Sequence, residues 1–223
     1  APKMEYRMDV SRAVLTRMTC RAFLPTPVAR KDVEAILSIA ARTPSGGNLQ
    51  PWRVWVLTGR PLQDLQARVL QKLEAGQIAQ LPPEYLLYPP NQKEPYVSRR
   101  FAAGEAMYEA LGVERNDHDG RMAQMRCNYE CFGAPTALFF AIDRDMQQGQ
   151  WAELGMFINS VMLLARERGL HTAAIGAWSL WSQTVRQVLP LPDDMMLYCG
   201  MGLGRADMAA LYVATAADWR GQK

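Results

Sequence analysis

The chain has 223 residues, of which 49% are hydrophobic and 21% are charged, and this length is sufficient for one sizeable hydrophobic core. Its 25 lysines and arginines are offset by 22 aspartates and glutamates, so the net charge of +3 gives no electrostatic footprint for nucleic acid binding. No apolar run approaches the roughly 20 residues that cross a bilayer, so the sequence gives no indication of a membrane-spanning segment.

The first third of the chain predicts three helices and one strand. Residues 16–23 form an arginine-rich turn, and the glycines within residues 44–48 interrupt the helical pattern before the strand. The strand is expected over Trp52–Thr58, which is rich in β-branched and aromatic residues. The three helices are expected over residues 9–15, 30–43 and 61–75.

Residues 76–100 differ from the segments on either side of them. Five prolines alternate there with Tyr85, Tyr88 and Tyr96. Because proline removes backbone donors and restricts the chain, this composition predicts an irregular excursion, and its tyrosines are suited to covering a pocket.

The second half of the chain alternates apolar helical patterns with short apolar runs, and it contains no linker or repeat. Helices are expected over residues 101–111, 121–132, 150–168 and 182–188. Strands are expected over residues 136–142, 171–175 and 196–201. We therefore predict one mixed α+β domain that covers residues 1–223.

The cysteines and histidines favour a reduced protein without a metal. The four cysteines are scattered through a chain that is large enough to fold without disulfides, and residues 1–5 lack the apolar core of a signal peptide. We therefore expect a cytoplasmic protein. Neither His118 nor His171 has a closely spaced cysteine, so we expect no zinc site. A cysteine–histidine nucleophile pair has no local signature in its favour and stays an open alternative.

Three alternating glycines, Gly200, Gly202 and Gly204, superficially resemble a dinucleotide-binding fingerprint. That fingerprint requires a long helix directly after it and a complete βαβ unit, and only 19 residues follow Gly204. We interpret these glycines instead as positions that let a strand turn at its end.

Two short constellations carry more chemistry. In Arg17-x-Thr19-x-Arg21, alternate residues of an extended segment point the same way, so two guanidiniums and a hydroxyl converge on one anion. The loop over residues 44–52 offers the hydroxyl of Ser45 and the amides of Asn48 and Gln50, which suit the edge of a polar heterocycle. The alternatives are solvated surface arginines and an ordinary polar turn between a helix and a strand.

In their order and spacing these segments resemble the FMN-dependent nitroreductase family, most closely its branch of nitrobenzoate and related nitroaromatic reductases. The resemblance covers nearly the whole chain and is carried by residues 17–23, 41–52, 132–135, 150–156 and 169–170. It implies an α+β fold with a central, mostly antiparallel sheet flanked by helices. It also implies a domain-entwined homodimer that holds two FMN molecules at the subunit interface.

The resemblance further implies which residues contact FMN. The flavin phosphate and ring edge would be bound by Arg17, Thr19, Arg21 and the backbone of Met18. The other subunit would contribute Pro44, Ser45 and Asn48, and Gln50 would line the same cleft. The flavin ring would lie beside the Asn128 amide and beside backbone N–H groups of Ile175, Gly176 and Ala177.

The sequence departs from the family pattern at two places. Residues 175–177 contain no acidic residue, and residues 206–212 lack the basic residues that complete the phosphate site in family members. Arg205 is the nearest candidate substitute, and Arg220 is the other.

The implied chemistry belongs mostly to the flavin, so we assign no side chain as acid, base or nucleophile. NADH or NADPH would give a hydride to FMN and leave before a small nitroaromatic substrate enters the same slot, which is a ping-pong cycle. We interpret the 13 methionines and 6 tryptophans mainly as core packing, and Trp52, Trp178 and Trp181 are the first tryptophans to examine near the flavin. The alternatives are reduction of quinones, enones or halogenated aromatics on the same fold, or a flavin-binding protein with little turnover.

Overall fold

The computed structural model of the chain describes residues 8–80 and 82–210. Four strands form one sheet in the order β1-β2-β4-β3, and all three neighbouring pairs are antiparallel. The strands are β1 (Trp52–Thr58), β2 (Thr136–Asp143), β3 (His171–Ile175) and β4 (Met195–Gly204). This arrangement confirms the predicted α+β class and its antiparallel central sheet.

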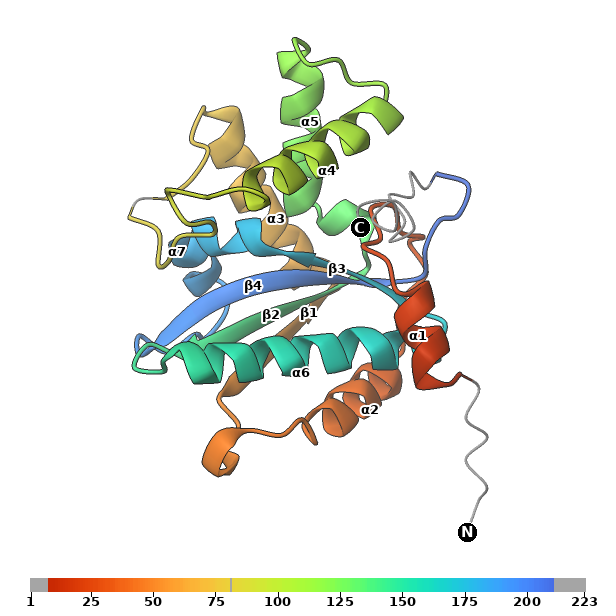
Figure 1. Ribbon diagram of the computed structural model, residues 1–223, viewed down its shortest axis with the longest axis vertical. Helices are drawn as coiled ribbons and strands as arrows, with labels where there is room; N and C mark the ends of the chain where they lie inside the picture. Colours follow the sequence, from red (N-terminus) through yellow and green to blue (C-terminus); the bar gives the residue numbers. More distant parts are fainter. Residues whose placement is uncertain (1–7, 81, 211–223) are drawn as a thin grey trace.

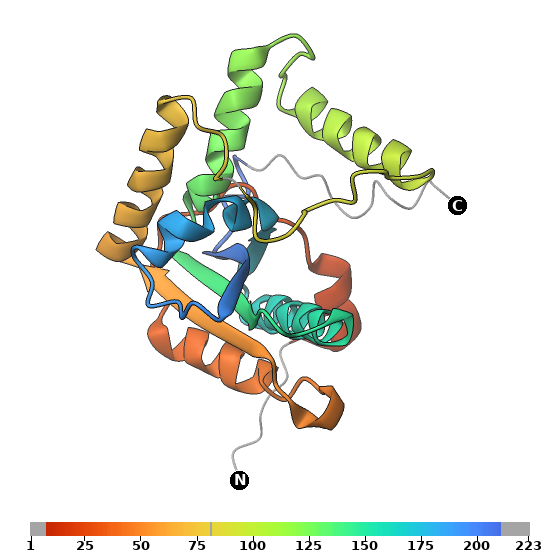
Figure 2. The same cartoon turned by 90° about the vertical axis from the view of Figure 1, so that its left-hand side faces the viewer.

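Helices cover both faces of the sheet (Figure 1). The α-helices are α1 (Val10–Thr16), α2 (Arg30–Ala40), α3 (Gly59–Glu74), α4 (Tyr96–Ala110), α5 (His118–Tyr129), α6 (Gln148–Glu167) and α7 (Ser182–Arg186). Short 3-10 helices are η1 (Gly46–Asn48), η2 (Cys131–Gly133) and η3 (Gly176–Trp181). In Figures 1 and 2, α1, α2 and α6 lie on one side of the sheet, and α3, α5 and α7 lie on the other. None of the helices in the described part of the chain combines the length and the apolar character needed to cross a membrane.

Strand β2 divides the hydrophobic core in two, because successive side chains of a strand point to opposite faces. Ala137, Phe139 and Ala141 belong to the cluster under α3, α5 and η3. Leu138, Phe140 and Ile142 alternate with them and pack against α2 and α6. Both sets are fully buried, so this strand forms the centre of the fold, as its unbroken apolar run predicts.

A β-bulge in β4 changes which face its side chains reach. Phe140 pairs with Cys199, but the next residue, Ala141, pairs with Leu197, so Tyr198 is the extra residue. As a result Leu197 packs with the α3 and α5 cluster, while Cys199 packs with the α6 cluster. The bulge therefore places Tyr198 and Cys199 side by side along the wall of a cavity described below.

The predicted elements are all present, and several of their limits differ. Helix α2 ends at Ala40, three residues early. Helix α5 begins at His118 because the Asp117 side chain accepts a hydrogen bond from Gly120 N at 2.8 Å and caps the helix. Helix α4 begins at Tyr96, so the last five residues of the predicted irregular excursion are helical.

The interpretation of the three alternating glycines is wrong. Gly200, Gly202 and Gly204 lie inside β4, which runs through to residue 204. A Cβ added to Gly200 would lie 2.4 Å from Cδ1 of Trp178, and one on Gly202 would lie 3.0 Å from the Cys131 carbonyl oxygen. These positions require glycine because neighbouring elements pack directly on the backbone of the strand.

Candidate active site

A cavity of about 620 Å³ opens where β3 ends, between α6 and the segment before α4. Its lining residues come from parts of the chain that are distant in sequence. They are Tyr85, Leu87, Tyr88, Asn128, Gly155, Ile158, Met162, Ala174, Ile175, Gly176, Ala177, Tyr198 and Cys199. The volume is within the range of cavities that hold small aromatic ligands and cofactors.

Two glycines keep this cavity open. Gly176 follows β3 directly, and a Cβ at this position would lie 3.2 Å from Cδ2 of Leu87. Gly155 lines the cavity from α6, and a Cβ there would meet no atom within 4 Å. Because Gly176 and Ala177 begin η3, their N–H groups have no acceptor within that helix. The backbone thus supplies hydrogen-bond donors at a wall without side-chain bulk.

The titratable side chains of this wall stay uncharged at neutral pH. Burial raises the pKa of the Cys199 thiol to about 12, and it also raises the pKa values of the Tyr85 and Tyr198 hydroxyls. The Tyr85 hydroxyl donates a hydrogen bond to the Tyr198 carbonyl oxygen at 2.5 Å. None of these three groups is suited to exchanging a proton near neutral pH.

The segment that carries Tyr85 is fixed to the body of the protein by a buried carboxylate. Glu84 accepts hydrogen bonds from Arg144 at 2.5 Å, from Arg186 at 3.2 Å and from the backbone N–H of Leu197 at 2.8 Å. Its side chain is only 10% exposed, so these bonds are shielded from water. Residues 84–88 therefore form a fixed wall of the cavity.

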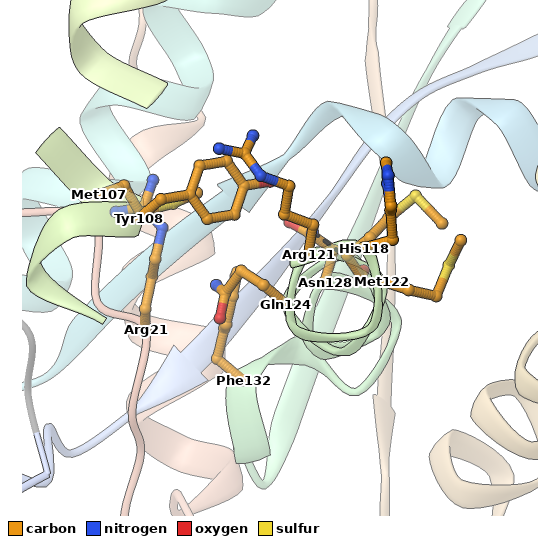
Figure 3. A pocket seen from close by; sticks show the side chains of 10 residues that line it. Arg21, Met107, Tyr108, His118, Arg121, Met122, Gln124, Asn128 and Phe132 are labelled. Atoms are coloured by element: carbon orange, nitrogen blue, oxygen red, sulfur yellow. Dashed lines mark hydrogen bonds between the residues drawn. The ribbon is translucent and has the colours of Figure 1, made fainter. Parts of the chain in front are cut away.

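A second cavity, of about 460 Å³, lies between α4 and α5, and Asn128 lines both (Figure 3). Arg21 reaches this second cavity from the segment after α1, as Figure 3 shows. The guanidinium of Arg121 lies over the Tyr108 ring, 4.0 Å from its centroid. Met107, Met122 and Met125 contribute flexible apolar surface.

The predicted Arg17-x-Thr19-x-Arg21 segment lies along β3. Thr19 forms a parallel bridge with Thr172, and Cys20 N donates to the Thr172 carbonyl oxygen at 3.0 Å. Cys20 is fully buried, whereas Arg17, Thr19 and Arg21 are half-buried on the other side of the extended backbone. Met18 packs against the core.

The predicted loop over residues 44–50 lies elsewhere. Its backbone is held in unusual conformations, with positive φ at Gly47, Asn48 and Gln50. The hydroxyl of Ser45 accepts from Gln50 N at 3.0 Å, and the Gln50 amide donates to Asn48 at 3.0 Å. Pro44, Asn48 and Gln50 are exposed, and no residue of this loop lines either cavity.

Of the remaining predicted residues, some line a cavity and others do not. Asn128, Ile175 and Gly176 line the cavity at the end of β3. Arg205 is exposed directly after β4, beside the turn that joins α6 to β3, where its Nη1 lies 3.8 Å from the Cβ position of Gly169. Arg220 lies outside the described residues.

The three tryptophans named for the flavin line neither cavity. Trp178 and Trp181 are fully buried in the core cluster, and Trp52 stacks on Phe157 with ring centroids 4.8 Å apart. Other cavity residues, among them Tyr198, Cys199 and Tyr108, were missed because their positions depend on the β4 bulge and on the α4–α5 pair. Two signals were available: Tyr85 and Tyr88 of the irregular segment line the first cavity, and among the methionines Met162 lines the first cavity and three others line the second.

No group of histidine, cysteine and acidic side chains suited to a metal ion occurs within residues 8–80 and 82–210. All four cysteines are free thiols, three of them buried. Burial raises the pKa of the Cys131 thiol to about 12, so this cysteine is not an activated nucleophile.

The sequence profile of the nitroreductase family matches residues 14–205. The chain belongs to the nitroreductase family. It is 36% identical over 202 residues to a 4-nitrobenzoate reductase of Pseudomonas putida, covering 89% of this chain and 86% of that protein. It is 38% identical to a chloronitrobenzene nitroreductase of Comamonas testosteroni, covering 86% of this chain and 84% of that protein.

A solved nitroreductase structure has the same fold. The crystal structure of the FMN and NADPH-dependent nitroreductase NfnB from Sphigopyxis sp. strain HMH superposes with a TM-score of 0.87 at 44% identity. The match covers 91% of each chain. The cavity at the end of β3 therefore lies in a nitroreductase fold rather than in an unrelated α+β scaffold.

Proposed function

We propose that the protein is an FMN-dependent oxidoreductase that reduces nitroaromatic compounds with NADH or NADPH by a ping-pong mechanism. The observation that carries this proposal is the cavity at the end of β3. It combines backbone donors at Gly176 and Ala177 with an apolar wall, and its tyrosine and cysteine side chains stay neutral. Such a site suits a planar redox cofactor that performs the chemistry itself.

The residues present fit FMN. The cavity is open because Gly155 and Gly176 lack side chains, and a Cβ at Gly176 would press on Leu87. We assign the phosphate to Arg17, Thr19 and Arg205, with the backbone of Met18 beside it. The ring edge is assigned to Arg21 and Asn128, and the ring face to the backbone at Ile175 and Gly176.

The chain would contribute binding and electrostatics rather than proton transfer. Bound FMN supplies hydride acceptance from the nicotinamide and electron delivery to the nitro group. The N–H groups of Gly176 and Ala177 would stabilise negative charge on a bound flavin ring. Tyr85 and Tyr88, which line the cavity, would limit the entry of water.

We also propose a cytoplasmic homodimer in which the loop over residues 44–50 completes the site of the partner subunit. On α6, Gly155, Ile158 and Met162 line the cavity, whereas Glu153 holds the loop by accepting from Gly46 N at 2.7 Å. At 3.6 residues per turn these two sets lie on opposite faces of the helix. The loop is thereby turned away from the cavity of its own chain, which supports a role across a subunit interface.

Stopped-flow mixing of the FMN-loaded protein with NADH or NADPH tests the proposal. We expect anaerobic bleaching of the oxidised flavin absorbance, followed by its return when 4-nitrobenzoate is added. A flavin that stays oxidised with both nucleotides would contradict the hydride step. A flavin that is reduced but does not reoxidise with nitroaromatics would favour another acceptor, and quinones would be the next to assay.

A further inference from the structure

Three arginines, Arg17, Arg166 and Arg205, belong to the segments that meet at the turn between α6 and β3, and Arg166 is absent from the set proposed above. Arg166 lies in the last turn of α6, where its Nη1 donates to the Leu170 carbonyl oxygen at 2.8 Å. Its Nε lies 3.4 Å from the hydroxyl of Thr16, the residue directly before Arg17. Arg205 approaches the same turn at Gly169.

The positive charge at this turn lacks a matching negative charge. Within residues 8–80 and 82–210, no carboxylate lies within 4.0 Å of the guanidinium nitrogens of Arg17, Arg166 or Arg205. Arg168, only two residues from Arg166, does have such a partner in Glu167 at 3.1 Å. At this end of α6, the arginine on the side that meets α1 and β3 therefore lacks a carboxylate partner, whereas its neighbour Arg168 has one.

Asp207, which lies two residues after Arg205, does not fill this role. One Asp207 oxygen accepts from the backbone N–H groups of Ala209 and Ala210 at 3.1 and 3.3 Å, so it caps its own turn. On the other side, His171 is neutral near pH 7, because burial and the neighbouring Arg166 lower its pKa to about 4. Partial burial also lowers the pKa of Arg166 itself, in keeping with the absence of a described carboxylate beside it.

We propose that Arg166 is a ligand of the FMN phosphate, which it binds together with Arg17 and Arg205. A phosphate monoester carries close to two negative charges near neutral pH, and guanidinium forks match its oxygens. Arg166 is preorganised for this contact, because its bonds to Leu170 and Thr16 fix its side chain against the residue that precedes Arg17. The inference rests on the proposed use of FMN.

Riboflavin, which is FMN without the phosphate, separates this role from a structural one. We compare the dissociation constants of FMN and riboflavin, from the quenching of flavin fluorescence, in the full-length protein and in Arg166→Gln. Arg168→Gln is the matched control, because it removes the same charge from the same end of α6. For Arg166→Gln we expect FMN to bind about 10- to 100-fold more weakly, with riboflavin changed by less than about twofold.

Each other outcome overturns the proposal in a distinguishable way. An equal loss for both flavins would show that Arg166 only supports the fold, and no loss for FMN would show that the phosphate is held elsewhere. An equal loss of FMN affinity in Arg168→Gln would show that the effect comes from long-range charge rather than from contact with the phosphate. Wild-type protein that binds neither flavin would contradict the proposed function itself.

A conservative variant covers the case in which Arg166→Gln does not fold. Arg166→Lys keeps the charge but loses the fork, so we expect FMN binding to weaken by about threefold and to become more sensitive to salt, with riboflavin unaffected. Unchanged FMN affinity and unchanged salt dependence in this variant would count against the proposal.

Discussion

Two segments were assigned to one flavin from the sequence, and they lie at opposite ends of α6. The segment over residues 16–21 meets the end of the helix, where Arg166 lies 3.4 Å from the Thr16 hydroxyl. The loop over residues 44–50 meets its beginning, where Glu153 accepts from Gly46 N. Thirteen residues separate Glu153 from Arg166, which is about 20 Å along a helix.

The difference shows that one chain does not bring its own two segments to one site. Residues 16–21 join the cavity side of the molecule, since Arg21 lines a cavity that shares Asn128 with the one at the end of β3. The loop instead follows α2, and directly before it the Thr43 hydroxyl bonds to the hydroxyl of Ser160 in α6 at 3.0 Å. In a twofold dimer, the loop of each chain is free to complete the site of the other.

The largest effect is expected from mixing two inactive variants. Arg17→Glu disables the segment over residues 16–21, and Ser45→Trp disables the loop over residues 44–50. The reductase activity of each variant alone should therefore be more than about tenfold below that of the wild type. Co-refolding equal amounts should restore about a quarter of the wild-type activity, because half of the dimers are mixed and each has one intact site of two. Refolded mixtures without recovered activity would place both segments in the site of a single chain.

A substitution at Gly204 tests how the segment after residue 21 packs against β4. A Cβ at Gly204 would lie 2.9 Å from Cδ of Pro135 and 3.0 Å from Cδ1 of Phe23. Gly204→Ala should lower the free energy of unfolding by about 1–3 kcal/mol and weaken flavin binding, because Phe23 must move. Gly149→Ala, in α6 with no atom within 4 Å, is the control and should be neutral or slightly stabilising in urea unfolding.

Glu153 tests the loop. Its Oε1 anchors Gly46, whereas its Oε2 is buried without a hydrogen-bond partner among the described residues. Glu153→Ala should cost about 1–2 kcal/mol of stability and loosen the loop without changing the cavity of the same chain. Limited proteolysis within residues 44–50 measures this directly. Glu167→Ala, at the other end of α6, should leave the cleavage rate unchanged.

The smallest expected effect is a loss of folding stability at acidic pH. Burial and Arg166 lower the pKa of His171 to about 4 in the folded protein, below the 6.5 of a free histidine. The unfolded chain therefore binds the proton first, so the stability from this residue is present above pH 6.5 and is lost as the pH falls toward 4. After discounting for its half exposure, we expect a loss of about 1 kcal/mol.

Unfolding of the flavin-free protein at pH 7 and pH 5 measures this effect. His171→Gln should show a smaller loss than wild type, and His118→Gln, at an exposed histidine of α5, should behave like wild type. Equal pH dependence in all three proteins would mean that His171 titrates as in the unfolded chain. Neither of the two histidines lies at the end of α6 that holds the loop. This contribution to the pH dependence of stability therefore belongs to the Arg166 end alone.

Local patterns predicted the elements because their causes are local. The unbroken apolar run of β2, the helical spacing of Val33 and Ile36, and the glycines before β1 each act through their immediate neighbours. The order and spacing of the motifs likewise carried the family resemblance. Placement of Asn128, Ile175 and Gly176 on one cavity followed from that resemblance.

Only the tertiary structure decided how these pieces are combined. The sequence by itself determined the α+β class and the nitroreductase family, and it predicted an arginine segment for an anion. It did not reveal that Tyr198 forms a bulge, that Trp178 requires a glycine at position 200, or that Arg166 joins the arginine cluster. These depend on contacts between residues far apart in the chain, and such contacts leave no periodic trace in the sequence.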